Sequence, residues 1–126
     1  MYLLDTHTLL WYLNNSNKIS DTVLKIINNE ENISLSIVSL WEIALKKNIG
    51  KLKIDCSISD IEKLCLEKDI KILPIKSSYL DELANLPSIH NDPFDRLIIA
   101  QAKIEKLIIL TKDRIIPEYP DVKVVW

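Results

Sequence analysis

Glycine is almost absent from this chain of 126 residues, which contains only Gly50. Phosphate-binding loops of the P-loop and GxGxxG types need glycines at fixed offsets, so both are excluded. Cysteine is also scarce, because Cys56 and Cys65 are the only two and belong to no CxxC-type pattern. We interpret each as an idle or buried thiol rather than part of a disulfide or a zinc site.

Long hydrophobic runs and an excess of basic charge are missing as well. No apolar stretch approaches the roughly 20 residues that a membrane span requires, and the N-terminal sequence MYLLDTHTLLWYLNN lacks a basic leader. We therefore expect a cytoplasmic protein. The formal net charge is −2, so no overall basic field attracts nucleic acid, although a local patch would suffice.

The composition that remains is typical of a globular protein, with 48% hydrophobic and 27% charged residues, and the length fits one domain over residues 1–126. Short apolar runs alternate with longer helical patterns, which favours an α/β domain with a mostly parallel sheet. The predicted strands are residues 2–5, 33–36, 70–75, 107–111 and 123–126. The predicted helices are residues 8–14, a segment starting at Ser20 or Asp21, another starting near Ser39, and residues 57–69, 77–86 and 93–105.

Two aspartates follow predicted strands. Asp5 ends the first strand, and Asp113 follows the LIILT strand by two residues. In open parallel sheets, ligands bind outside the carboxyl ends of the strands. Aspartate also favours turns and caps, and for either residue alone this structural interpretation is the stronger one.

Glu42 allows two interpretations. The segment from Ser39 to Glu42 fits the capping box S-x-x-E. Glu42 also shares a helical face with Val38, Leu45 and Ile49, and we expect no basic partner one turn away on that face. Burying an unpaired carboxylate is costly, so the pattern favours a ligand role over a cap.

Asp92 and Asp95 are separated by their positions in one predicted helix. Pro93 fits the first helical position, which makes Asp92 the N-cap and Asp95 the third helical residue. Arg96 could pair with Asp92. Asp95 heads a face formed by three apolar residues further along the helix: Ile98, Ile99 and Ala102.

Four acidic residues therefore come from two strand ends and two helix starts: Asp5, Glu42, Asp95 and Asp113. If they converge, their mutual repulsion is severe at neutral pH. A divalent cation relieves it, and oxygen-only ligands suit Mg²⁺ or Mn²⁺ rather than zinc. Such a cation binds phosphate oxygens, activates water and stabilises the leaving oxygen of a phosphodiester.

Four segments in this order resemble the PIN-domain ribonucleases, specifically the toxin subunits of VapBC-type toxin–antitoxin pairs. The segments are DTHTLLW, SLWEIALKK, DPFDRLIIAQA and ILTKD. The resemblance covers almost the whole chain. It implies a three-layer α/β/α fold, Mg²⁺- or Mn²⁺-dependent endoribonuclease activity, homodimers, and a small antitoxin that blocks the active site.

The resemblance also implies residue roles. The catalytic and metal-binding set would be Asp5, Glu42, Asp95 and Asp113. Thr111 would place a hydroxyl near the metal, and Asp92 would be a supporting residue typical of one subgroup. A water activated by the metal would attack the scissile phosphate, with Glu42 binding the metal or orienting the water.

Other residues around these motifs remain open between two interpretations. A group of lysines could line a path for the RNA backbone or simply be a solvated helix end: Lys46, Lys47, Lys51 and Lys53. His7 and His90 could lie beside the site or on an ordinary surface. The tryptophans favour core or interface positions over base stacking: Trp11, Trp41 and Trp126.

Two other α/β classes fit poorly. A response-regulator receiver domain needs an acidic pair after the first strand and an aspartate after a central one. A haloacid-dehalogenase phosphatase needs a second aspartate where His7 stands. The remaining alternative is a non-enzymatic module of the same fold that binds RNA or a protein, and metal-dependent RNA cleavage by the pure protein discriminates between the two.

Overall fold

The computed structural model describes every residue from 1 to 126 and contains one parallel sheet with strand order β3-β2-β1-β4-β5. The strands are β1 (Tyr2–Leu4), β2 (Ile33–Ser36), β3 (Ile70–Leu73), β4 (Ile108–Leu110) and β5 (Lys123–Val125). From β1 the chain adds strands on one side, and then returns to add β4 and β5 on the other. The order reverses between β1 and β4, and at such a point parallel strands leave a crevice outside their carboxyl ends.

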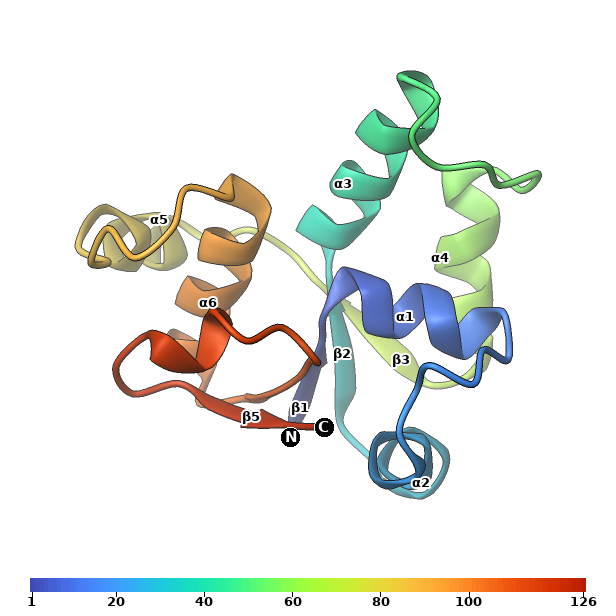
Figure 1. The fold of residues 1–126 in the computed structure, drawn as a ribbon, viewed down its shortest axis with the longest axis horizontal. Coiled ribbons are helices and arrows are strands. Elements are labelled where there is room, and N and C mark those ends of the chain that lie inside the picture. Colours follow the sequence, from blue (N-terminus) through green and yellow to red (C-terminus); the bar gives the residue numbers. More distant parts are fainter.

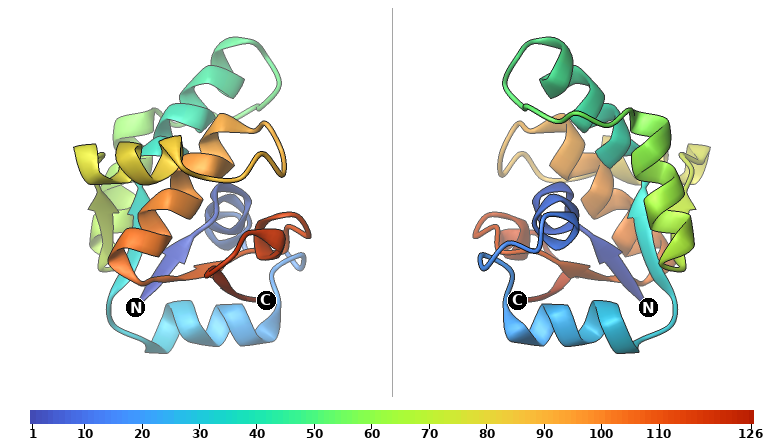
Figure 2. Two further views of the ribbon diagram at one scale, coloured as in Figure 1. Left: turned by 90° about the vertical axis from the view of Figure 1, so that its left-hand side faces the viewer. Right: turned by 90° about the vertical axis from the view of Figure 1, so that its right-hand side faces the viewer.

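Helices cover both faces of this sheet (Figures 1 and 2). They are α1 (Thr6–Leu13), α2 (Asp21–Asn29), α3 (Ile37–Asn48), α4 (Ile58–Glu67), α5 (Ser77–Ala84) and α6 (Pro93–Glu105), with a short 3₁₀ helix η1 (Ile116–Glu118). Helices α5 and α6 pack on one face, and α1, α2 and α4 pack on the other. The predicted α/β/α fold is confirmed, with a sheet that is entirely parallel. None of these helices has the length and apolar character needed to cross a bilayer.

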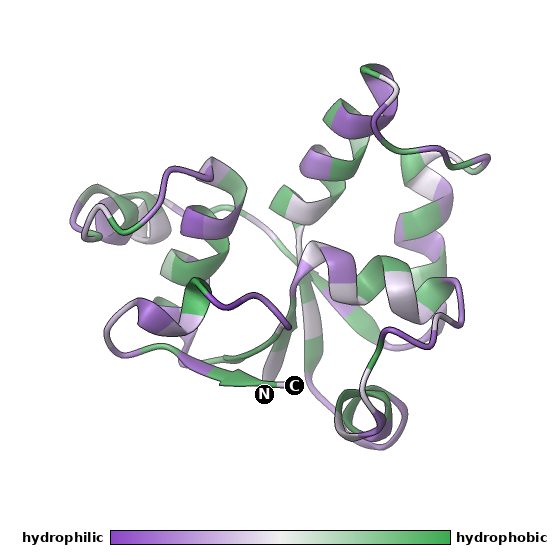
Figure 3. Ribbon diagram, viewed as in Figure 1, coloured by the Kyte–Doolittle hydropathy of each residue, from purple (hydrophilic) through white to green (hydrophobic).

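Alternation along the strands builds the two cores. Leu3 lies opposite Ile109 and packs with α5 and α6, whereas the next residue, Leu4, lies opposite Leu110 and packs with α1, α2 and α4. All four side chains are fully buried. Hydrophobic and hydrophilic segments alternate along α4 and α6 because each of these helices turns one side toward a core (Figure 3).

Three of the predicted helices begin after a capping side chain, and the cap predicted at Asp92 is one of them. Ser20 accepts a hydrogen bond from the Val23 N–H, Ser57 forms a capping box with Asp60, and Asp92 caps α6. The start predicted near Ser39 is wrong.

Helix α3 instead begins at Ile37, and the Ser36 hydroxyl accepts the Val38 N–H at 3.0 Å. The chain passes from β2 into α3 without a loop because Ser36, the last residue of the strand, is also the cap. Glu42 therefore belongs to no capping box.

The role of Asp92 as a cap can be tested by two substitutions. Its Oδ1 accepts the N–H groups of Phe94 and Asp95 at 2.9 and 3.0 Å. Asp92→Ala should lower the free energy of unfolding by about 1 kcal/mol, whereas Asp92→Asn should leave it nearly unchanged because asparagine caps about as well. Urea denaturation measures both values. An equal loss in the two variants would contradict the cap.

Candidate active site

Asp5 lies at the carboxyl end of β1, inside the crevice between β1 and β4. Its backbone N–H donates to the Leu110 carbonyl, and the residue is 6% exposed. Oδ1 accepts the Thr6 N–H at 2.7 Å, and Oδ2 accepts the Thr111 hydroxyl at 2.8 Å. Burial raises the pKa of Asp5 above its ordinary value, and these hydrogen bonds oppose the shift only in part.

Thr111 connects Asp5 to Asp113. Thr111 is 2% exposed. Its hydroxyl donates to Asp5 and accepts the Asp113 N–H at 3.0 Å. Asp113 in turn accepts the Ile115 N–H at 2.7 Å through Oδ1. Asp113 thus has the turn-forming role that aspartate often has after a strand. It also borders the same cavity as Asp5.

Asp95 reaches the same region from the N-terminus of α6. As predicted, the residues that follow it on its face, Ile98 and Ile99, are fully buried. The predicted pairing of Arg96 with Asp92 is wrong, because the Arg96 guanidinium donates to the Pro87 carbonyl and the Tyr119 hydroxyl, each at 2.9 Å.

The acidic side chains act on one another electrostatically. Burial, followed by the negative charges of Asp5 and Asp92, raises the pKa of Asp95 to about 7, with a smaller contribution from Asp113. The charge of Glu42 adds slightly to the raised pKa of Asp5. The structure therefore brings the four predicted acids into one electrostatic neighbourhood, although no three His, Cys, Asp or Glu side chains form a compact metal cluster.

Glu42 is buried, as expected, but it is paired. Lys46, four residues further along α3, places its Nζ 2.7 Å from Glu42 Oε2. The expectation that no basic residue lies one turn away was wrong. Burial lowers the pKa of Lys46, but the hydrogen bond and the charge of Glu42 outweigh it, so the pKa of Lys46 is raised.

The apolar face expected around Glu42 is also only partly a core face. Val38 is fully buried, whereas Leu45 and Ile49 are 42% and 61% exposed. The reason is that α3 leaves β2 and projects beyond the sheet (Figures 1 and 2). Trp41, Leu45 and Ile49 follow one another at four-residue intervals and form an exposed apolar stripe along this helix.

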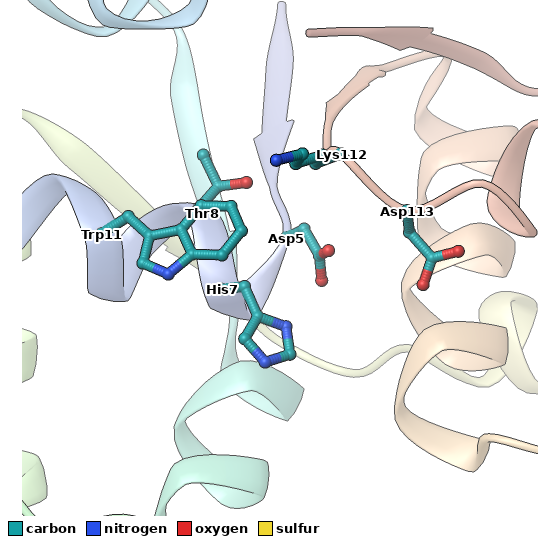
Figure 4. A pocket seen from close by; sticks show the side chains of 6 residues that line it. All are labelled: Asp5, His7, Thr8, Trp11, Lys112 and Asp113. Atoms are coloured by element: carbon teal, nitrogen blue, oxygen red, sulfur yellow. The ribbon is translucent and has the colours of Figure 1, made fainter. Parts of the chain in front are cut away.

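A cavity of about 320 Å³ opens beside Asp5 (Figure 4). Its lining comes from both flanks of the β1–β4 crevice: Asp5, His7, Thr8, Trp11, Lys112 and Asp113. Trp11 packs edge-on against Trp126 and also faces this cavity. Lys112 is not among the site residues predicted from the sequence, although its position between Thr111 and Asp113 could have indicated that it lies at the site.

The lysines after Glu42 divide into two groups. Lys46 and Lys51 line a second cavity of about 280 Å³ together with His7, which also lines the first. Lys47 donates to the Cys56 carbonyl at 2.9 Å and is a structural contact of the irregular connection. Lys53 is exposed and lines neither cavity, so two of the four lysines border the cavities.

His90 contacts Asp95, and Tyr119 in turn contacts His90. His90 Nε2 lies 3.2 Å from Asp95 Oδ2, and His90 Nδ1 lies 2.7 Å from the Tyr119 hydroxyl. The sequence leaves His90 open between a position beside the site and an ordinary surface position, and no sequence pattern indicates a role for Tyr119. The four carboxylates and the Thr111 hydroxyl are oxygen donors, and such donors suit a hard divalent cation.

The family follows from the sequence match. A family model described as the PIN domain matches residues 2–122, so the chain belongs to the PIN domain family. A search of curated proteins finds no match.

Solved structures with the same fold are similar over nearly their whole length. VapBC2 from Rickettsia felis, bound to a DNA fragment from its promoter, has a TM-score of 0.75 and 16% identity over 98% of this chain and 96% of that chain. FitAcB from Neisseria gonorrhoeae has a TM-score of 0.70 and 19% identity over 100% and 97%. A toxin–antitoxin complex from Klebsiella pneumoniae has a TM-score of 0.67 and 17% identity over 100% and 97%. At these identities the likeness shows the fold.

The raised pKa of Asp95 predicts how stability depends on pH in the metal-free protein. Its pKa is about 7 when folded and near 3.8 when unfolded, so its contribution is fully present below pH 3.8 and is lost as pH rises through 7. Asp95→Asn should abolish that loss. In EDTA at pH 8, the variant should therefore melt at or above the wild-type temperature.

Asp81→Asn is the matched control, because Asp81 is an exposed aspartate on α5. Thermal melts from pH 4 to pH 8 should show the same slope for this variant as for the wild type. An Asp95→Asn variant that loses stability between pH 4 and pH 8 as steeply as the wild type would show that Asp95 ionises normally.

Proposed function

We propose that this protein is a metal-dependent endoribonuclease and the toxin of a toxin–antitoxin pair. The observation that carries the proposal is that Asp5, at the carboxyl end of β1, lies close enough to Asp95 for their charges to interact, while burial raises the pKa of both carboxyls. Burying acids together destabilises a fold and is retained where function needs it. Membership in the PIN domain family supports nuclease chemistry.

Asp5, Asp95 and Asp113 would hold Mg²⁺ or Mn²⁺. When bound, the cation supplies the Lewis acidity that phosphodiester hydrolysis requires. The Thr111 hydroxyl fixes the orientation of Asp5. Lys46 pairs with Glu42 through Oε2, so a cation that Glu42 helped to bind would compete with Lys46 for this carboxylate.

The RNA backbone would run past the lysines that border the two cavities. Lys112 borders the cavity beside Asp5, and Lys46 and Lys51 border the adjacent one. His7 lies between them, lining both. Lys51 and Lys112 belong to no ion pair in the structure, whereas Lys46 is paired with Glu42. Unpaired lysines suit phosphate contacts without sequence readout.

A non-enzymatic module of the same fold is the alternative. It would retain RNA or protein binding with no need for buried acids. The pKa values of Asp5 and Asp95 favour the nuclease, because a binding surface gains nothing from carboxylates that repel one another.

Cleavage of RNA tests the two alternatives. Purified protein free of any partner should cut total RNA in Mg²⁺ or Mn²⁺ and stop in EDTA, and Asp5→Asn or Asp95→Asn should lower the rate by orders of magnitude. The Asp81→Asn variant should retain full activity. RNA binding without cleavage in Mn²⁺ would establish the non-enzymatic module, and cleavage that persists in excess EDTA would overturn the four-acid site.

The partner would be a small antitoxin protein. Solved structures of the same fold include toxin–antitoxin complexes, which supports such a partner here. The exposed stripe of Trp41, Leu45 and Ile49 lies on the helix that carries Glu42 and offers an apolar contact beside the site. The cytoplasmic location and the homodimer implied by the family resemblance stay predictions.

Co-expression tests the partnership. The neighbouring gene should encode a small protein that relieves growth arrest caused by this chain and that co-purifies with it. Leu45→Glu should weaken the complex, because a charge replaces an apolar contact, whereas Ile104→Glu on the exposed side of α6 should not. A chain that is harmless alone and binds no protein from a neighbouring gene would refute the toxin assignment. A complex that Leu45→Glu does not weaken would show that the partner does not bind at the stripe.

A further inference from the structure

His90 lies in the loop before α6 and bridges a site carboxylate and a buried tyrosine. Its Nε2 lies 3.2 Å from Asp95 Oδ2, and its Nδ1 lies 2.7 Å from the Tyr119 hydroxyl. The side chains of His90 and Asp95 are 14% and 15% exposed, and Tyr119 is 2% exposed. Solvent therefore competes little for these hydrogen bonds.

The surroundings of the Tyr119 hydroxyl decide where its proton goes. Two N–H groups donate to its oxygen, Arg96 Nη1 at 2.9 Å and the His90 backbone at 3.3 Å. Neither donor can accept a proton, and a phenol oxygen has two lone pairs. The hydroxyl proton is thus directed to a different acceptor, and His90 Nδ1 at 2.7 Å is nearer than the His90 carbonyl at 3.4 Å.

This arrangement assigns the tautomer of His90. If Nδ1 accepts from Tyr119, the ring proton resides on Nε2, which then donates to Asp95 Oδ2. Arg96 also fixes the loop itself, because Nη1 shares its two hydrogens among the Tyr119 hydroxyl and the carbonyls of Pro87 and His90. Tyr119 and Arg96 therefore fix the orientation of the His90 ring, the position of its loop and the nitrogen that carries its proton.

We propose that His90, oriented by Tyr119 and Arg96, is a positioning residue that holds the Asp95 carboxylate in its cation-binding orientation. The inference rests on the proposed function, since it concerns Asp95 as a ligand. Hydrogen bonds to a ligating carboxylate fix its orientation, and losing such a partner typically costs about 10- to 100-fold in metal affinity or activity.

The test measures Mn²⁺ affinity directly, by the electron paramagnetic resonance signal of free Mn²⁺ during titration of each protein. Tyr119→Phe and His90→Ala should each raise the Mn²⁺ dissociation constant by about 10-fold or more. His90→Gln should restore much of the affinity, because its amide nitrogen can donate to Asp95 from a position similar to Nε2.

Tyr79→Phe is the matched control. Tyr79 belongs to the same buried cluster as Tyr119, but its hydroxyl makes no hydrogen bond to His90, Asp95 or Arg96. Removing it should leave the Mn²⁺ dissociation constant unchanged. Loss of affinity in Tyr79→Phe equal to that in Tyr119→Phe would reduce the effect to core packing and overturn the positioning role.

A second readout needs no metal. Nitrogen-15 NMR of the metal-free protein should show His90 protonated at Nε2, and Tyr119→Phe should alter that pattern while Tyr79→Phe should not. A His90 ring protonated at Nδ1 alone would overturn the assignment. Wild-type protein that binds no Mn²⁺ would overturn the proposed function together with this role. Tight binding that is unaffected by His90→Ala and Tyr119→Phe would overturn this role alone.

Discussion

Repulsion between carboxylates at the β1–β4 crevice is the constraint on which the rest of this site depends. Parallel strands bring their carboxyl ends to one edge of the sheet, so Asp5 and the segment after β4 meet there whatever else the chain does. Helix α6 adds Asp95 from its N-terminus. Burial then makes each negative charge more costly, which is why the pKa values of Asp5 and Asp95 are both raised.

Three of the four acids have a side-chain hydrogen-bond partner of their own. Thr111 donates to Asp5, Lys46 to Glu42, and the His90 ring contacts Asp95. The donors come from different elements and only Lys46 carries a fixed positive charge, so they reduce the repulsion without removing it. A divalent cation would complete the neutralisation, and the donors would then keep the carboxylates oriented for it.

Much of this was predictable from the sequence because it depends on local patterns. The buried strands follow from short apolar runs, and Pro93 distinguishes Asp92 as the cap from Asp95 at the third helical position. The start of α3 was missed because Ser36 ends a strand and caps a helix at once, which leaves no loop signal between them.

The errors around Glu42 have a different cause. The apolar residues that share a helical face with Glu42 predict a core face, but α3 projects past the sheet, which leaves Leu45 and Ile49 exposed. The pairing with Lys46 follows from the four-residue spacing that brings helical side chains together, so the sequence already contained its signal. The contact between His90 and Tyr119 joins residues far apart in the chain, one before α6 and the other after η1. No local pattern indicates that these two loops meet, so it required the three-dimensional structure.

The most direct measurement of the central claim is the titration of the Asp95 carboxyl by carbon-13 NMR, with and without saturating Mg²⁺. Without the cation, the carboxyl should titrate near pH 7, as its raised pKa requires. With Mg²⁺, the midpoint should fall below the ordinary aspartate value, because a bound cation favours the charged form. A carboxyl that titrates near pH 3.8 in the metal-free protein, or one whose midpoint Mg²⁺ does not move, would contradict the account.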